Sequence, residues 1–243
     1  MRTDPPVEVF GQGLDGRFQS RLSVGEKMMQ AAVAAHFCSL GYYVATDLEL
    51  PEGYRHYADV AGIRPILREL KRRGRLGPAP AGVLHLLDHE GWTPTEVIIE
   101  STGNDPDFAR GILLESEGKG WVEKRVLEED LVEWRLKDYS YPGRDAFIAL
   151  CGSSSPTQAL ENLREVSECC NVSYLVLDFE VDEAFMDLCF SDGIGVMVHV
   201  PRNGYFREIL PAENREINDR KGFMSLCERI LFENYVLRRD EWI

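Results

Sequence analysis

The first 63 residues carry one helix-like pattern of hydrophobic residues followed by two strand-like patterns. The helix is expected over residues 23–41, and its apolar residues occupy opposite sides, which predicts that it is well buried. The strands, residues 42–50 and 54–64, are rich in β-branched and aromatic residues, and the turn signal Pro-Glu-Gly separates them. We therefore expect a β-hairpin after the first helix.

Strongly apolar short segments alternate with helical segments in the last part of the chain. Strands are expected at residues 145–152, 172–180 and 194–202, and helices at residues 155–171, 181–193 and 219–237. The second and third of these strands are apolar enough to be central in a sheet. This alternation predicts an α/β fold with helices covering the sheet.

The middle third of the chain has a different periodicity. Three short helices are expected at residues 81–91, 93–103 and 105–120, followed by two extended runs within residues 121–136. Three short helices and a β-ribbon resemble a winged helix-turn-helix, and the run Gly118, Gly120, Trp121 and Val122 resembles the start of its first wing strand. Residues 64–140 are therefore expected to form an inserted winged-helix-like (α+β) domain.

The formal net charge of -14 argues against a protein that coats DNA tightly, because phosphates are held mainly by Lys and Arg. One basic cluster is an exception, and it either contacts phosphates or forms the solvated face of a helix and linker. Its members are Arg64, Arg68, Lys71, Arg72, Arg73 and Arg75. The third helix of the middle segment adds Arg110 and Lys119, but residues 78–142 as a whole carry six basic against fourteen acidic residues. This acidic surface favours protein docking over duplex binding.

Other chemistries leave no signature in the sequence. The six cysteines include no C-x-x-C pair, so buried free thiols are expected rather than a zinc site or disulfides. No run of about 18 apolar residues is present, and residues 1–16 lack the features of a signal peptide. We therefore expect a cytoplasmic protein without a membrane partner.

Outside the middle segment, the order helix, hairpin, strand, helix, strand, helix, strand resembles the core of the PD-(D/E)XK nuclease superfamily. This is the fold of many restriction and Holliday-junction-cleaving enzymes. The resemblance covers residues 1–63 and 141–243, with the middle segment inserted between the second and third core strands. It implies a restriction-endonuclease-like mixed sheet flanked by helices.

The resemblance also implies a site on the second strand. Asp59 matches the first aspartate of the motif, which would be a metal ligand, and an Asp inside an apolar strand is costly unless it is paired or bound to a cation. Glu26 matches a glutamate that such enzymes often carry near the start of the first helix. Its alternative role is a capping box with Ser23.

The third strand lacks the rest of the motif, because Ala149 and Cys151 stand at the positions of the acid and the lysine. Hydrolysis by this route needs two carboxylates on Mg²⁺ and a lysine beside the attacking water. Catalysis is therefore expected to be lost or severely impaired. A migrated lysine such as Lys137 would rescue it, although the alternation around Lys137 favours a wing strand.

Three hypotheses for function follow. The first is a catalytically silent accessory or regulatory protein in nucleic-acid metabolism, which binds DNA or a DNA-processing protein and needs no cofactor. The second is an active Mg²⁺-dependent endonuclease that uses Asp59, Glu26 and Lys137. The third is a protein-interaction scaffold without nucleic-acid contact, and a homodimer remains open in each case.

Overall fold

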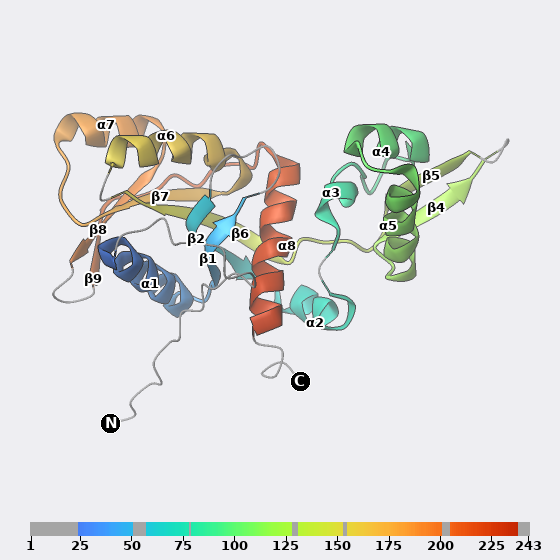
Figure 1. Cartoon of the computed structure of the whole chain (residues 1–243), viewed down its shortest axis with the longest axis horizontal. Coiled ribbons are helices and arrows are strands. Elements are labelled where there is room, and N and C mark those ends of the chain that lie inside the picture. Colours follow the sequence, from blue (N-terminus) through green and yellow to red (C-terminus); the bar gives the residue numbers. More distant parts are fainter. Residues whose placement is uncertain are drawn as a thin grey trace, which may run out of the picture.

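The computed structural model describes residues 24–50, 57–77, 79–127, 131–152, 155–200 and 205–237. These residues form two lobes with a long helix, α8 (Arg220–Leu237), between them (Figure 1). We call them the large-sheet lobe, built on a mixed six-stranded sheet, and the small-sheet lobe, built on a three-stranded sheet within residues 79–139. The expected α/β class is confirmed. No helix of the described residues is both long and apolar enough to cross a bilayer.

The large sheet has the strand order β1-β2-β6-β7-β8-β9. Its strands are β1 (Tyr43–Glu49), β2 (Tyr57–Pro65), β6 (Gly143–Cys151), β7 (Val172–Leu177), β8 (Gly195–Val200) and β9 (Tyr205–Leu210). The pairs β6-β7 and β7-β8 are parallel, and the remaining pairs are antiparallel. The expected antiparallel pairing of the first two strands is therefore confirmed, and the two strands expected to be central are flanked on both sides.

Helices cover both faces of the large sheet (Figure 1). One face packs on α1 (Val24–Ser39), through residues that include Met29, Val33 and Phe37. The other face packs on α6 (Pro156–Val166), α7 (Glu183–Ser191) and one side of α8. Because alternate residues of β6 from Ala146 to Cys151 enter the two cores, this part of the strand is buried on both faces, which explains its apolar sequence.

The small-sheet lobe follows α2 (Leu67–Leu76) along the chain. Its elements are α3 (Ala81–Leu84), β3 (Thr93–Pro94), α4 (Thr95–Thr102), α5 (Pro106–Gly118), β4 (Val122–Val126) and β5 (Val132–Leu136). Its strands pair in the order β3-β5-β4. The fully buried Trp121 and the indole of Trp134 lie at its centre, and Met224 of α8 joins the same core. A side chain from α8 therefore completes the interior of the small-sheet lobe.

Two expectations about elements are wrong. The helix expected at residues 81–91 ends at Leu84. Beyond it, the backbone N of Leu86 and of Leu87 donate to carbonyls three residues earlier, so the chain continues as tight turns rather than as an α-helix. Strand β9 was not expected, because its charged Arg207 and Glu208 interrupt the apolar pattern that marks the other strands.

A buried ion pair connects the two lobes. Arg73 of α2 and Glu228 of α8 lie 3.1 Å apart, and their side chains are 1% and 4% exposed. Glu228 also accepts hydrogen bonds from the hydroxyl of Tyr139 at 3.0 Å and from the backbone N of Ala79 at 2.8 Å. Arg73 Nη2 additionally donates to the carbonyl of Ser140 at 3.1 Å.

The rest of the Arg73 guanidinium is held by aromatic rings. Its Nε and Nη1 have no hydrogen-bond partner in the described part of the chain, but its central carbon lies 5.0 Å from the ring centroids of Trp121 and Tyr139. Such cation–π contacts stabilise a desolvated cation. Arg73 was expected among the phosphate-contacting residues, and this expectation is wrong because the side chain lies inside the protein.

We predict that Glu228→Gln destabilises the protein by roughly 3 kcal/mol, because it leaves the Arg73 charge buried without a counter-charge. Urea unfolding of the variant at pH 7 measures the change. The matched control is Glu233→Gln, which alters an exposed glutamate on the same helix and is expected to have little effect. Equal stability of the two variants would show that the ion pair does not hold the lobes together.

Candidate functional site around Asp59

Asp59 lies on β2 between the fully buried Ala58 and Val60. Val60 pairs with Ala149 of the antiparallel strand β6. Asp59, one residue earlier on β2, therefore lies close to the C-terminal end of β6. Its Oδ2 accepts a hydrogen bond of 2.6 Å from the backbone N of Cys151. This bond supplies the partner that a carboxylate on an apolar strand requires.

The structure brings Glu26 close to Asp59, and it adds Asp47, which sequence reasoning missed. Thr46 and Leu48 of β1 pair with Val60 and Ala58 of β2. Asp47, which lies between the first two residues, is therefore opposite Asp59. Asp47 has a φ of 51°, a left-handed conformation that Asp tolerates better than most residues. The signal for it was the aspartate in the first strand of the predicted hairpin.

Gln30 of α1 connects Asp47 and Asp59 by hydrogen bonds. Its Nε2 donates to Asp47 Oδ1 at 3.0 Å and to the carbonyl of Asp59 at 2.7 Å. Glu26 lies one helical turn earlier on α1 and is only 5% exposed. Ser23, its predicted capping partner, lies outside the described residues.

Burial raises the pKa of Asp59 from 3.8 to about 7. Desolvation is the main cause, and the hydrogen bond from Cys151 opposes it. The negative charges of Asp47 and Glu26 raise this pKa further. Near neutral pH, Asp59 therefore holds a proton for a large fraction of the time.

The positions of the missing acid and lysine belong to the core beneath α1. Ala149 is 0% exposed and Cys151 is 7% exposed, and both pack in the cluster that contains Met29 and Val33. Desolvation, followed by the charge of Asp59, raises the pKa of the Cys151 thiol well above its ordinary value. A neutral buried thiol is a poor nucleophile, so Cys151 does not replace the lost groups.

Mg²⁺ prefers several oxygen ligands in octahedral geometry. One carboxylate oxygen of Asp59 is already occupied by the backbone N–H of Cys151. No group of three or more His, Cys, Asp or Glu side chains among the described residues has an arrangement that could hold a metal ion. The site combines acidic residues without the geometry for two-carboxylate chemistry.

Lys137 does not join this site. It follows β5, where its backbone N donates to the carbonyl of Trp121 at 2.9 Å. This bond keeps Lys137 on the small-sheet lobe, whereas Asp59 belongs to the large sheet (Figure 1). The migrated-lysine hypothesis therefore receives no support from the arrangement of the lobes.

The members of the predicted basic cluster lie in different environments in the structure. Arg64 stacks on the ring of Tyr42 at 4.9 Å, and Arg72 donates a hydrogen bond to the carbonyl of Asp138. Arg68 and Lys71 are exposed on α2, and the side chain of Arg75 lies outside the described ones. Together with the burial of Arg73, this leaves a smaller cationic surface than the sequence predicts.

The two basic residues expected on the third helix of the middle segment both have acidic partners. Arg110 lies 3.7 Å from Asp107, and Lys119 lies 2.6 Å from Glu115 while stacking on Trp121 at 4.9 Å. Exposed pairs of this kind are weak, but the adjacent carboxylates cancel the positive charge that a phosphate would meet.

Comparison with protein families, with curated proteins and with solved structures finds no match for this chain.

We predict that Asp59→Asn stabilises the protein near neutral pH. An unfolded Asp ionises near pH 3.8 and the folded one near 7, so the folded chain binds the extra proton between these values. Wild-type stability therefore falls as pH rises through this window, and the Asn variant avoids a penalty of about 4 kcal/mol above it.

Thermal or urea unfolding at several values from pH 4 to 8 measures this difference. Asp187→Asn, at an exposed position of α7, is the matched control and is expected to leave the pH profile unchanged. A wild-type protein that gains stability from Mg²⁺, with the gain lost in Asp59→Asn, would instead identify Asp59 as a metal ligand.

Proposed function

We propose that this chain is a catalytically silent accessory protein with a nuclease-like core, which acts through a protein partner rather than through DNA. The observation that carries the proposal is the pair Ala149 and Cys151, buried under α1 where catalysis would need an acid and a lysine. The order of α1, β1, β2, β6, α6 and β7 supports the resemblance to the PD-(D/E)XK core. A role in nucleic-acid metabolism rests on that resemblance alone.

The small-sheet lobe supports the resemblance to a winged helix. Its elements follow one another as α3, β3, α4, α5, β4 and β5, and the first strand pairs with the last. In a DNA-binding protein of this type, α5 would lie in the major groove and the β4-β5 hairpin would be the wing. The chemistry of these two surfaces therefore distinguishes DNA from protein as the partner.

The outer side of α5 suits a protein better than a duplex. Asp107, Arg110, Leu114 and Glu117 recur at intervals of three or four residues, which places them on one side of the helix. Leu114 is 53% exposed, and the only cation of this set pairs with Asp107. An apolar residue among carboxylates offers little to base edges or phosphates.

The wing also lacks uncommitted cations among its described residues. Arg125 and Arg135 pair with carboxylates of the opposite strand, at 2.7 Å from Glu133 and 2.6 Å from Glu123. Both guanidinium groups lie 4.5 Å from the ring centroid of Trp92. The arginines therefore rigidify the hairpin instead of presenting charge to a phosphate.

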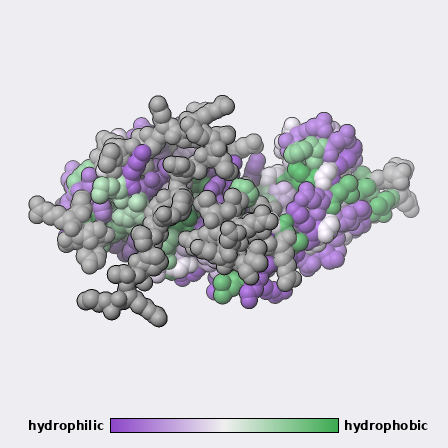
Figure 2. All heavy atoms as spheres, turned by 60° about the horizontal axis from the view of Figure 1, so that its bottom comes forward, coloured by the Kyte–Doolittle hydropathy of each residue, from purple (hydrophilic) through white to green (hydrophobic). Residues whose placement is uncertain are grey.

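Apolar side chains replace cations near the end of the wing. Val126, Leu127 and Leu131 are 60%, 41% and 38% exposed. Figure 2 shows hydrophobic residues gathered among hydrophilic ones on the small-sheet lobe. A partner with an apolar contact surface and a basic rim would complement this lobe.

We predict that the protein shows no saturable binding to single-stranded, duplex or branched DNA in fluorescence anisotropy titrations up to about 10 µM protein, even at low salt where phosphate attraction is strongest. The same substrates are expected to remain uncut in Mg²⁺ or Mn²⁺. Salt-sensitive binding that disappears in Arg68→Gln/Lys71→Gln would restore DNA as the partner. Cleavage that is lost in Asp59→Ala would overturn catalytic silence.

We also predict that a photo-crosslinking residue placed at Leu114 captures a protein in cells of the source organism, in a product that resists nuclease treatment. The matched control places the same residue at Gln158, an exposed position on α6 of the large-sheet lobe. A protein captured only from position 114 supports the proposal. Nucleic acid captured from position 114, or identical products from both positions, would contradict it.

A further inference from the structure

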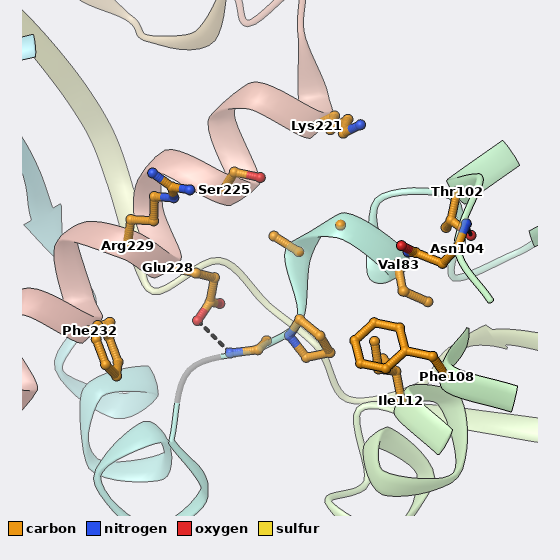
Figure 3. Close-up of a pocket in the computed structure, with 14 residues that line it drawn as sticks. Val83, Thr102, Asn104, Phe108, Ile112, Lys221, Ser225, Glu228, Arg229 and Phe232 are labelled. Carbon is orange, nitrogen blue, oxygen red and sulfur yellow. Dashed lines mark hydrogen bonds between the residues drawn. The ribbon is translucent and has the colours of Figure 1, made fainter. Parts of the chain in front are cut away.

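A cleft of about 420 Å³ lies between α8 and the small-sheet lobe (Figure 3). One wall is a stripe of α8 formed by Lys221, Ser225, Arg229 and Phe232, which share a side of the helix through their spacing. Opposite them lie residues of α3, α5 and the turn between α4 and α5. The volume falls within the range of about 300–1,000 Å³ that is typical of small-molecule sites.

Both polar and apolar side chains line the cleft. In Figure 3, Lys221 lies at the end where Asn104 approaches from the turn after α4, and Ser225 lies one helical turn further along α8. Phe108 and Ile112 of α5 lie side by side below Asn104. Phe108 is 59% exposed, so much of its ring is available for stacking.

The charges around the cleft leave one cation available. The Glu228 carboxylate lies at its floor, but Arg73 neutralises it and Tyr139 and Ala79 occupy its oxygens. Arg229 donates to the carbonyl of Glu49 and lies 3.8 Å from its carboxylate.

Lys221 is different, because the described residues give its ammonium no ion pair. Its neighbour Arg220 pairs with Asp88, and the Asp219 carboxylate accepts a hydrogen bond from the backbone N of Gly222. An anion entering the cleft therefore meets an ammonium that has no ion pair with the described residues.

We propose that this cleft binds a small anion with a flat aromatic body, of the size of a nucleoside monophosphate. Lys221 neutralises the anionic group, and Asn104 and Ser225 supply hydrogen bonds beside it. The aromatic body stacks on Phe108 and packs against Ile112. The inference goes beyond the proposed function, because it assigns a ligand and does not depend on the surface formed by Leu114 and the wing.

Binding would stabilise the arrangement of the two lobes. Lys221 and Ser225 belong to α8, whereas Asn104, Phe108 and Ile112 belong to the small-sheet lobe. A ligand that contacts both walls raises the melting temperature of the whole chain, because it binds the native arrangement of α8 and the lobe and not the unfolded state.

Isothermal titration calorimetry of the full chain tests this site with four probes: adenosine monophosphate, adenosine, inorganic phosphate and indole-3-carboxylate. The expected result is saturable binding of adenosine monophosphate or indole-3-carboxylate with a sub-millimolar Kd. Adenosine and phosphate, which each carry only half of the recognised chemistry, are expected to bind at least about tenfold more weakly. The stronger of the two aromatic anions identifies phosphate or carboxylate as the natural anionic group.

Matched variants locate the binding. Lys221→Gln and Phe108→Ala are each expected to weaken the aromatic anion about tenfold while leaving thermal unfolding of the free protein nearly unchanged. The controls Lys71→Gln on α2 and Phe190→Ala on α7 change exposed residues of the same types and are expected to bind normally. No saturation by either aromatic anion, or an equal loss in the control variants, would overturn the assignment.

Discussion

The arrangement of the two lobes depends on the buried ion pair between Arg73 and Glu228. Removing two charges from water is costly, and the pair is tolerable only when further contacts satisfy both groups. Those contacts come from both connections between the lobes. Glu228 accepts from Ala79 on the connection into the small-sheet lobe, and Arg73 donates to Ser140 on the connection out of it. One ion pair therefore fixes α8 and both chain crossings together.

The carboxylates of Glu228 and Asp59 are both desolvated, and the cost of this desolvation is reduced in different ways. Glu228 keeps a cationic partner and also accepts the Tyr139 hydroxyl, whose pKa is raised well above its ordinary value by burial and then by Glu228. Asp59 accepts a hydrogen bond from a backbone N–H, and desolvation together with two acidic neighbours raises its pKa to about 7. Cys151, whose backbone N donates to Asp59, supplies no positive charge, so protonation of Asp59 reduces the cost.

Much of the architecture was predictable because burial of the large sheet is visible as apolar sequence. The strands containing Ile148, Val176 and Val198 are mostly apolar, and each pairs on both sides. What the sequence does not reveal is which charged residues become internal. Arg73 was grouped with its exposed neighbours, since its burial depends on Glu228, which lies 155 positions away.

The candidate site, too, was only partly predictable, because its residues are brought together by strand pairing. Asp59 was singled out because it interrupts an apolar strand, but the role of Asp47 depends on hairpin register and on a φ of 51°. Likewise, α3 is shorter than its apolar pattern predicts, and the carbonyl of Asp88 beyond its end pairs with Leu136 of the small sheet. Strand register and long-range hydrogen bonds determine such features, and the local pattern of apolar residues does not contain them.

Helix α8 determines how the two lobes can act together. Phe223, Leu226 and Ile230 pack into the large-sheet lobe, while Met224 enters the core of the small-sheet lobe. Moving one lobe relative to the other would expose Met224 and separate Glu228 from its partners, at a cost of several kcal/mol. Function through a wide hinge motion is therefore disfavoured. A rigid two-lobed body with a cleft along α8 fits these energetics better.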